Sequence, residues 1–249
     1  MVRNLIKRSQ ALVALATAVR SLPSDARRFG AWLARPKLIR SYLQGRATRK
    51  LQIGSGPNLL DGWLNTDYVP TRTGQVYLDA TKPFPFPDGT FDYIFSEHVL
   101  GEFTYPVGLF MLRECLRVLK PGGRIRLSTP NLENILTLAG PQGAEEIQRS
   151  YVRWAVERYL PQVKQCEAAF VLNYFFRGHS LVFVYSPELL TLALTTAGFA
   201  GPTFHEPGRS DDATLAGLES HGKIVGEDIN RFESMIAEAT KPPSPSAHA

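Results

Sequence analysis

Residues 51–67 read LQIGSGPNLLDGWLNTD, and this stretch decides the fold. An apolar run, Leu51–Ile53, enters a loop of glycine, serine, proline and asparagine, Gly54–Asn58. Such a loop interrupts regular structure because its residues favour turns. A second short run, Trp63–Thr66, then ends at Asp67. The stretch therefore predicts a β-strand that runs into a glycine loop and is followed closely by a second strand.

Further strands alternate with helices downstream. Val76–Leu78 and Phe91–Ser96 predict a third and a fourth strand. Leucines at a 3–4 spacing predict a helix over Val107–Leu119, and a fifth strand follows at Arg124–Ser128. Pro187–Ala197 predicts the last helix. This alternation favours a Rossmann-like α/β fold, in which a mostly parallel sheet carries helices on both faces.

Polar or small residues stand at the ends of the predicted strands. They are Gly54, Asp67, Asp79, Ser96 and Thr129. In open parallel sheets, ligands bind beyond the carboxyl ends of the strands. These residues are therefore expected to converge on one crevice.

The composition divides the chain into a leader, a body and a tail. Residues 1–49 form a basic helical leader, 50–240 one domain, and 241–249 a tail whose composition is typical of disorder. A stretch at about 131–176, rich in helix formers and aromatic residues, is expected to cap the crevice. Its aromatic side chains either line a substrate pocket or form a separate small core. Two cysteines are too few for a disulfide framework, which favours a reducing compartment.

The formal charge of +5 is unevenly distributed along the chain. Residues 1–50 carry twelve Lys or Arg and one acid, a net charge of +11, whereas the remaining 199 residues carry a net charge of −6. Nucleic-acid binding needs a basic surface on the binding domain, so the acidic body argues against a nucleic-acid substrate. The basic pI therefore comes from the leader, and it bears on what the leader contacts rather than on the substrate.

The leader reads as two helices. Residues 5–22 place an apolar arc opposite polar and basic side chains, and residues 26–43 form a second, strongly basic helix. These helices either pack on the body or bind an anionic membrane surface or an acidic partner. The apolar stretch Ala11–Val19 is nine residues long, far short of the about 20 that span a bilayer. We therefore expect a cytoplasmic protein with peripheral contact to the inner face of a membrane; a signal peptide is the weaker alternative.

A set of motifs in a fixed order resembles the class I S-adenosylmethionine-dependent methyltransferases, in particular the methyltransferase type 11-like group. The motifs are Gly54-Ser55-Gly56, Asp79-Ala80, Phe91-Asp92, Ser96-Glu97-His98-Val99-Leu100 and Lys120-Pro121-Gly122-Gly123. The resemblance covers residues 51–130 and resumes over 178–199. It implies S-adenosylmethionine as the cofactor and methyl transfer to a small-molecule or saccharide acceptor. It specifies neither the acceptor atom nor the oligomeric state.

The resemblance also assigns nine residues to the cofactor. They are Gly54, Ser55, Gly56, Asp67, Tyr68, Asp79, Ala80, Ser96 and Glu97. The glycine loop would cradle the amino-acid end of the cofactor, because glycine lets the backbone approach a ligand closely. Asp67 would accept hydrogen bonds from the ribose hydroxyls, and Asp79 would approach the adenine. In the alternative interpretation, the glycines form a plain turn and the aspartates cap strand ends.

Three features depart from the common family pattern. Gln52 stands where many relatives carry an acid, and Gly101-Glu102 replaces a second Glu-His pair. Only nine residues separate the first two predicted strands, fewer than a helical crossover needs. The Gly-Trp-x-Asn-x-Asp pattern within Asp61–Asp67 resembles a subgroup of relatives that share this short connection between the first two strands. The leader could cover the sheet face left open, in which case deleting residues 1–44 would lower the melting temperature by several degrees.

Methyl transfer from a sulfonium is an in-line displacement, so positioning supplies much of the rate. A base is needed only where the nucleophile is protonated, and no metal site is expected. His98 and His179 are the candidates for a base or a substrate contact, since a neutral imidazole takes a proton near pH 7. A purely structural role for each histidine is the alternative.

Two other functions compete with methyl transfer. A nucleotide-dependent oxidoreductase would carry Gly-x-Gly-x-x-Gly and an acid about 20 residues later. Here the third glycine is absent, and Asp67 follows Gly56 by eleven residues. The second competitor is a membrane- or partner-associated binding protein that keeps the fold without turnover.

Overall fold

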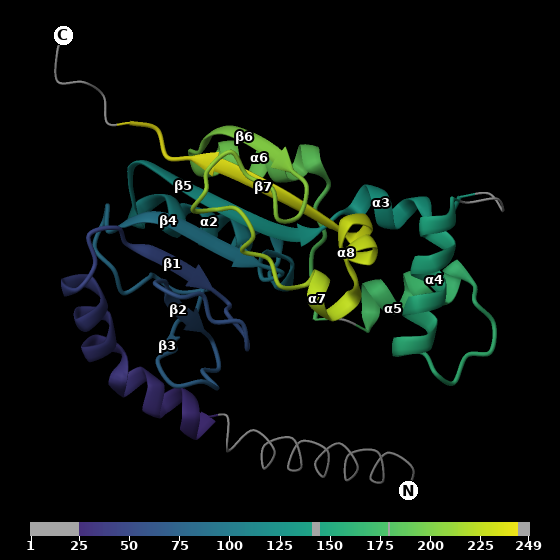
Figure 1. Cartoon of the computed structure of the whole chain (residues 1–249), viewed down its shortest axis with the longest axis horizontal. Helices are drawn as coiled ribbons and strands as arrows, with labels where there is room; N and C mark the ends of the chain where they lie inside the picture. Colours follow the sequence, from purple (N-terminus) through teal and green to yellow (C-terminus); the bar gives the residue numbers. More distant parts are fainter. Residues whose placement is uncertain (1–24, 141–144, 179, 244–249) are drawn as a thin grey trace, which may run out of the picture.

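The computed structural model describes residues 25–140, 145–178 and 180–243, and its centre is a seven-stranded sheet (Figure 1). The strands are β1 (Lys50–Ile53), β2 (Leu64–Asp67), β3 (Val76–Tyr77), β4 (Phe91–Glu97), β5 (Leu119–Pro130), β6 (Ala200–His205) and β7 (Ser234–Thr240). Their order is β3-β2-β1-β4-β5-β7-β6; β7 is antiparallel to both neighbours, and the other pairs are parallel. The predicted mostly parallel α/β sheet is confirmed.

One face of the sheet packs against α2 (Tyr105–Val118) and α6 (Pro187–Ala197). Leu51 of β1 pairs with Leu64 of β2 and Ile94 of β4, so the three side chains share this face. All three are buried in one cluster with residues of both helices. This face therefore holds the main hydrophobic core.

A segment without regular structure covers the opposite face. Between β1 and β2 the chain, described throughout, forms turns and no helix, as the short spacing predicts. Leu215 and Leu218 belong to the segment 206–219, which follows β6, and they pack against Trp63 and Phe95. The segment 206–219 thus provides the cover that a helix between β1 and β2 would have given.

The described part of the leader, residues 25–44, is a helix that packs on the other side. Ile39 is buried in the same cluster as α2 and α6. The Tyr42 hydroxyl donates to the carbonyl oxygen of Lys50 (2.9 Å), which fixes the helix to the start of β1. The expectation that the leader covers the open face is therefore wrong for these residues. The predicted helix over 5–22 lies outside the described residues.

A helical module lies beyond the carboxyl ends of the parallel strands (Figure 1). Its helices are α3 (Leu132–Thr137), α4 (Glu146–Tyr159), α5 (Ala168–Arg177), α7 (Gly222–Val225) and α8 (Glu227–Glu233). Tyr151, Phe175 and Phe232 are buried in a hydrophobic cluster of its own. Several aromatic residues of the insertion thus build a small core, one of the two alternatives expected from the sequence, whereas Phe170 and Phe176 are exposed.

Capping residues set the bounds of α6 as the sequence predicts. The Ser186 side chain accepts a hydrogen bond from the backbone N–H of Leu189 (3.2 Å), and Pro187 takes the first helical position. Gly198 ends the helix with a φ of 106°, a left-handed conformation that favours glycine. The helix predicted over 187–197 is therefore confirmed with its bounds.

Candidate functional site

A pocket opens at the carboxyl ends of β1, β2 and β4. β1 and β4 are neighbours, but the chain continues from β1 to one side of this pair and from β4 to the other. Such a reversal leaves a crevice in which ligands bind. The pocket volume is about 460 Å³, within the range of about 300–1,000 Å³ for small-molecule sites. It is lined by Ile53, Gly54, Gly56, Asp67, Tyr68, Leu78, Asp79, Ala80, Thr81, Glu97, His98, Val99, Glu102 and Phe103.

The glycine loop after β1 forms one wall of this pocket. Gly54 and Gly56 have φ values of 69° and 50°, where other residues are strained. A Cβ on Gly54 would lie 2.1 Å from Val99 Cγ2, so Gly54 is required by packing. A Cβ on Gly56 would meet no described atom within 4 Å. Gly56 therefore serves the backbone conformation and leaves bare peptide in the pocket wall.

Two aspartates stand beside the glycine loop with fixed orientations. Asp67 accepts hydrogen bonds from the backbone N–H of Val69 (2.8 Å) and of Gly56 (2.8 Å). Asp79 Oδ1 accepts from the backbone N–H and the hydroxyl of Thr81 (3.0 and 2.6 Å). A carboxylate offers about four acceptor sites. Each aspartate therefore keeps acceptor capacity for donors on a ligand.

Tyr68 and Ala80 also belong to the lining of this wall. The Tyr68 side chain is partly exposed, and the guanidinium of Arg28 lies 4.7 Å from the centre of its ring. Arg28 also donates a hydrogen bond to the Tyr68 hydroxyl. The leader helix therefore contacts the rim of the pocket.

Two of the expected residues support the pocket from behind. Ser55 and Ser96 are buried, and neither is among the described residues that line the pocket. Ser55 Oγ accepts a hydrogen bond from Gln75 Nε2 (2.7 Å), which anchors the loop. The Gln52 amide donates to the carbonyl of Asn58 (3.1 Å) and holds the far end of the same loop. Gln52 therefore has a structural task in holding this loop.

The end of β4 forms the opposite wall. The Glu97 carboxylate accepts hydrogen bonds from the backbone N–H and hydroxyl of Ser220 and from the backbone N–H of His221. Glu97 thereby holds the stretch 220–221 against the strand. His98 has a φ of 54°, which is uncommon for a residue other than glycine. Such strain concentrates at functional sites, where the surrounding structure enforces it.

Two residues that the sequence did not assign lie beside His98. The rings of His98 and His221 have centroids 4.2 Å apart, and His221 Nε2 lies 2.6 Å from Glu233 Oε1. The Tyr151 hydroxyl donates to Glu233 Oε2 (2.8 Å). Burial alone would raise the pKa of the Glu233 carboxyl, but the hydrogen bonds from His221 and Tyr151 and the charges of both histidines hold it below its usual value. No local spacing links these residues, so sequence reasoning missed them.

Glu102 is a fourth carboxylate in the pocket lining, beside Asp67, Asp79 and Glu97. It ends the short 3-10 helix η1 (Leu100–Glu102), and its sequence position marked only a departure from the family pattern. Desolvation and the charge of Asp67 raise the pKa of its carboxyl, whereas a hydrogen bond from Ser180 Oγ (3.2 Å) opposes this shift. With Asp67, Asp79 and Glu102 in its walls, the pocket suits a ligand that carries positive charge and several donors.

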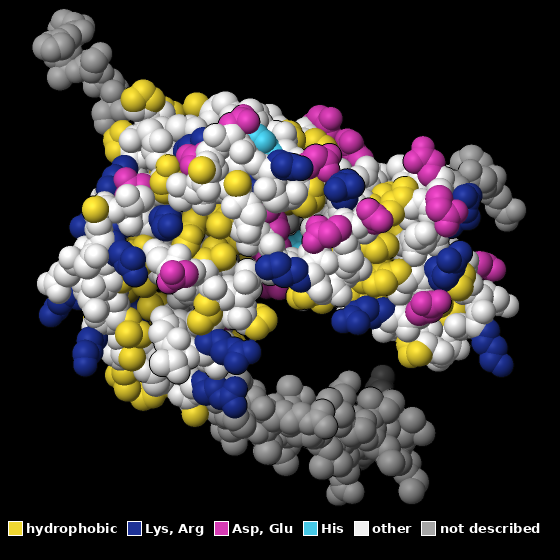
Figure 2. All heavy atoms as spheres, viewed as in Figure 1, with side chains coloured by type: hydrophobic (Ala, Val, Ile, Leu, Met, Phe, Trp, Pro, Cys, Tyr) yellow, Lys and Arg dark blue, Asp and Glu magenta, His cyan; other side chains and the backbone are white. Residues whose placement is uncertain are grey.

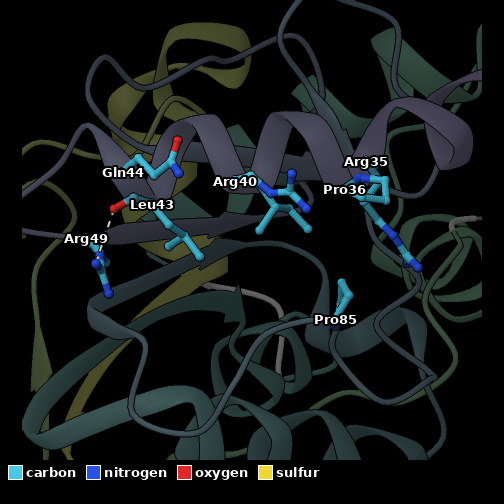
Figure 3. Close-up of a pocket in the computed structure, with 8 residues that line it drawn as sticks. Arg35, Pro36, Arg40, Leu43, Gln44, Arg49 and Pro85 are labelled. Atoms are coloured by element: carbon cyan, nitrogen blue, oxygen red, sulfur yellow. Dashed lines mark hydrogen bonds between the residues drawn. The ribbon is translucent and has the colours of Figure 1, made fainter.

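Other candidate features lie away from this pocket. His179 lies outside the described residues. A cavity of about 600 Å³ separates the leader helix from the loop before β4, with Arg35, Arg40 and Arg49 around apolar side chains (Figure 3). A groove of about 800 Å³ runs between α4 and α8. Neither combines a glycine loop with carboxylates at strand ends, so the pocket beside Asp67 is the candidate active site.

Residues 61–127 match the model of the methyltransferase domain family. This match covers β2, β3, β4 and α2, and it includes Asp67, Asp79 and His98. None of the curated protein sequences is significantly similar to the chain.

Several solved structures are similar to this chain. A SAM-dependent methyltransferase from Archaeoglobus fulgidus has 16% identity and a TM-score of 0.47, over 90% of this chain and 99% of that one. One from Mesorhizobium loti has 18% identity and a TM-score of 0.46, over 83% and 97%. Phosphoethanolamine N-methyltransferase 2 from Haemonchus contortus, solved with phosphomonomethylethanolamine and S-adenosylhomocysteine, has 15% identity and a TM-score of 0.43, over 85% and 53%. At these values the likeness concerns the fold, and no argument about the reaction rests on it.

Proposed function

We propose that this chain binds S-adenosylmethionine in the pocket beside Asp67 and transfers its methyl group to a small-molecule or saccharide acceptor. One observation carries the proposal: a single crevice combines the glycine loop, Asp67 and Asp79 on one wall with His98 on the other. The match of residues 61–127 to the methyltransferase domain family supports it independently.

The pocket residues fit the groups of this cofactor. The bare peptide at Gly54 and Gly56 would take its amino-acid end. Asp67 would accept hydrogen bonds from the ribose hydroxyls, and Asp79 would accept from the adenine amino group, because each carboxylate keeps free acceptor sites. Glu102 adds negative charge that suits the cationic sulfonium and the ammonium group.

The chain supplies positioning, and the cofactor supplies an activated methyl group. Transfer needs the acceptor atom held in line with the methyl group, which is a matter of orientation. His98 lines the wall opposite the glycine loop and is the side chain that we assign to the acceptor. The net charge of −6 beyond residue 50 favours a small acceptor over a nucleic acid.

Isothermal calorimetry of the full chain with S-adenosylmethionine tests the cofactor assignment. We expect binding, and Asp67→Asn should weaken it by about tenfold or more, because a carboxylate–hydroxyl hydrogen bond is worth about 1.5–3 kcal/mol. Asp92→Asn is the matched control, since Asp92 binds Arg49 N and Lys120 Nζ at the opposite end of β4. Heat from NADH and none from S-adenosylmethionine would point to the oxidoreductase instead. Binding without methylation of any compound in a metabolite extract would favour a binding protein.

We further infer that the helix over 25–44 attaches the protein to an anionic membrane surface from the cytoplasm. Phe29, Trp32 and Leu33 lie at helical spacing and are 61%, 47% and 59% exposed. Lys and Arg side chains gather where the described chain begins (Figure 2). An apolar stripe beside basic side chains is the pattern of an interfacial helix. No helix within 25–140, 145–178 or 180–243 is long and apolar enough to cross a bilayer.

Cosedimentation with vesicles tests this attachment. The chain should bind phosphatidylglycerol vesicles and not pure phosphatidylcholine, with binding reduced by salt. Leu33→Ser should weaken binding by about tenfold, because burying one leucine side chain is worth about 1.5–3 kcal/mol. Leu192→Ser, at a 55% exposed leucine of α6, is the control. Equal loss in both variants, or equal binding to both lipids, would contradict the assignment.

A further inference from the structure

Three side chains of the kind that ligate metals converge behind the wall of the pocket. They are His98 at the end of β4, His221 before α7 and Glu233 at the end of α8. One potential ligand atom from each lies within 4.8 Å of the other two. We propose that these residues bind a divalent first-row transition-metal ion such as Zn²⁺.

The distances suit one shared ion. Ligand atoms around a tetrahedral Zn²⁺ at about 2.0–2.2 Å lie about 3.3–3.6 Å apart. The three ligand atoms all lie within 4.8 Å of one another and therefore reach this geometry with shifts of about an ångström. His221 Nε2 and Glu233 Oε1, 2.6 Å apart in a hydrogen bond, already bring a nitrogen and an oxygen ligand together and would move apart by about an ångström around the ion.

Each of the three ligands is held by groups outside the cluster. The backbone N–H of His98 donates to the carbonyl of Ser128 (2.9 Å), and the backbone N–H of His221 donates to Glu97 (2.9 Å). The Tyr151 hydroxyl donates to Glu233 (2.8 Å). The contact from Tyr151 is of the kind that orients a metal ligand and raises affinity, and the two backbone contacts fix the residues that carry the imidazoles. The arrangement is therefore prepared before an ion arrives.

The donor set selects the class of ion. Two imidazoles and one carboxylate suit Zn²⁺, Co²⁺, Ni²⁺ or Fe²⁺, whereas Mg²⁺ and Ca²⁺ prefer oxygen ligands alone. Three protein ligands leave coordination positions open, as in catalytic rather than structural zinc sites. The exposed thiol of Cys166 is not part of this cluster.

The metal-ligand cluster adjoins the pocket in which the proposed methyl acceptor would bind. Of the three residues, His98 lines the pocket, so a bound ion would lie at the pocket wall. A hydroxyl or carboxylate oxygen of an acceptor could complete its coordination there, and the pKa of a coordinated hydroxyl falls. This role rests on the proposed methyl transfer, but metal binding itself does not.

Equilibrium dialysis of the untagged full chain, stripped with EDTA and carrying Cys166→Ser, tests the site with Zn²⁺ and with Co²⁺. We expect one equivalent of Zn²⁺ per chain, a rise in melting temperature that EDTA reverses, and visible absorption bands for the Co²⁺ form. Failure of the unaltered site to bind either ion would overturn the proposal. All three ligand residues are unaltered in this measurement, so its outcome does not depend on whether a ligand variant folds.

Substitutions then locate the ion. His221→Gln and Glu233→Gln should each abolish the binding of this one equivalent of Zn²⁺. Tyr151→Phe should weaken the affinity for Zn²⁺ by about tenfold, because the hydrogen bond to Glu233 is lost. His205→Gln is the control, because His205 lies 3.8 Å from Glu238 in another histidine–carboxylate pair. Retained stoichiometry in folded His221→Gln and Glu233→Gln proteins would place the ion elsewhere. Calorimetry with S-adenosylmethionine on the stripped protein reports separately on the proposed function.

Discussion

At the scale of single residues, the pocket carboxylate Glu102 gives a pH dependence of stability through its raised pKa. An acid whose pKa is raised in the folded state binds its proton more tightly there. The folded state therefore loses stability as the pH rises from the unfolded pKa through the folded one. We expect Glu102→Gln to raise the melting temperature at pH 7.5 by at most about 1 °C, because Glu102 is exposed and solvent screens much of the effect. The difference should vanish near pH 3.5, where both states are largely protonated.

Differential scanning calorimetry at the two pH values checks this expectation. Glu157→Gln, at an exposed glutamate of α4, is the matched control and should leave the melting temperature unchanged at both. A lower melting temperature for Glu102→Gln at pH 7.5 would show that this carboxylate stabilises the fold.

Sequence reasoning identified several pocket residues because strand ends converge in a parallel sheet. Gly54, Asp67 and Asp79 lie together in the pocket lining for this reason. Ser55 and Ser96 stand at strand ends too, but their side chains are buried behind the wall. A motif gives the position of a residue and not the direction of its side chain, which depends on the local backbone.

The cluster of His98, His221 and Glu233 could not be anticipated in the same way. Its members come from the residue after β4, from the loop before α7 and from α8, so only the tertiary fold brings them together. The sequence placed His98 at the site and left His221 without a role. Long-range contacts of this kind leave no periodic signal in one sequence.

At the scale of elements, a partly buried ion pair within α2, Glu114–Arg117, joins this helix to the segment before β4 through hydrogen bonds with the backbone of Phe84. Glu114 accepts hydrogen bonds from Arg117 (2.7 Å) and from the backbone N–H of Phe84 (2.6 Å). The hydrogen bond from Arg117 holds the pKa of the Glu114 carboxyl below its usual value, although desolvation opposes it. Because the folded pKa is lowered, the stabilisation is present above the unfolded pKa and is lost as the pH falls through the folded one.

We therefore expect Glu114→Gln to lower the free energy of unfolding at pH 7 by about 2 kcal/mol. The difference from the wild type should shrink as the pH falls below about 4, in urea unfolding followed by fluorescence. Glu146→Gln is a matched control: Glu146 and Arg149 have the same spacing, but their side chains are 71% and 52% exposed, against 12% and 29% for Glu114 and Arg117. Exposed pairs contribute little. Equal effects of the two substitutions would contradict the role given to burial.

Elements with local signals were predicted well, whereas β7 was not. Ser186 and Gly198 mark the ends of α6 in the sequence, and the structure places them there. β7 reads SMIAEAT, in which only Ile236 and Thr240 are β-branched and two alanines and a glutamate are poor strand formers. It forms a strand because it is almost wholly buried between β5 and β6. Tertiary packing thus overrides the local preference.

At the scale of the whole molecule, the segment 206–219 joins the open sheet face to the site. Arg126 of β5 is fully buried and pairs with Glu219 of this segment and with Glu238 of β7. The carbonyl of Arg209 accepts a further hydrogen bond from Arg126 (2.9 Å). The next residues, 220–221, are held by Glu97 at the pocket. The buried ion network therefore fixes both the cover of the sheet and the position of His221.

Glu219→Gln removes one charge from this network and leaves the buried guanidinium of Arg126 incompletely compensated. Breaking a buried pair in this way costs about 3–5 kcal/mol, whereas an exposed pair is worth little. We expect a fall in the free energy of unfolding of this order and faster tryptic cleavage after Arg209, because the segment detaches from the sheet. Glu206→Gln is the control within the same segment, since Glu206 pairs with Arg231 where both side chains are more than half exposed. Unchanged cleavage in the Glu219 variant would mean that Leu215 and Leu218 hold the segment without the ion network.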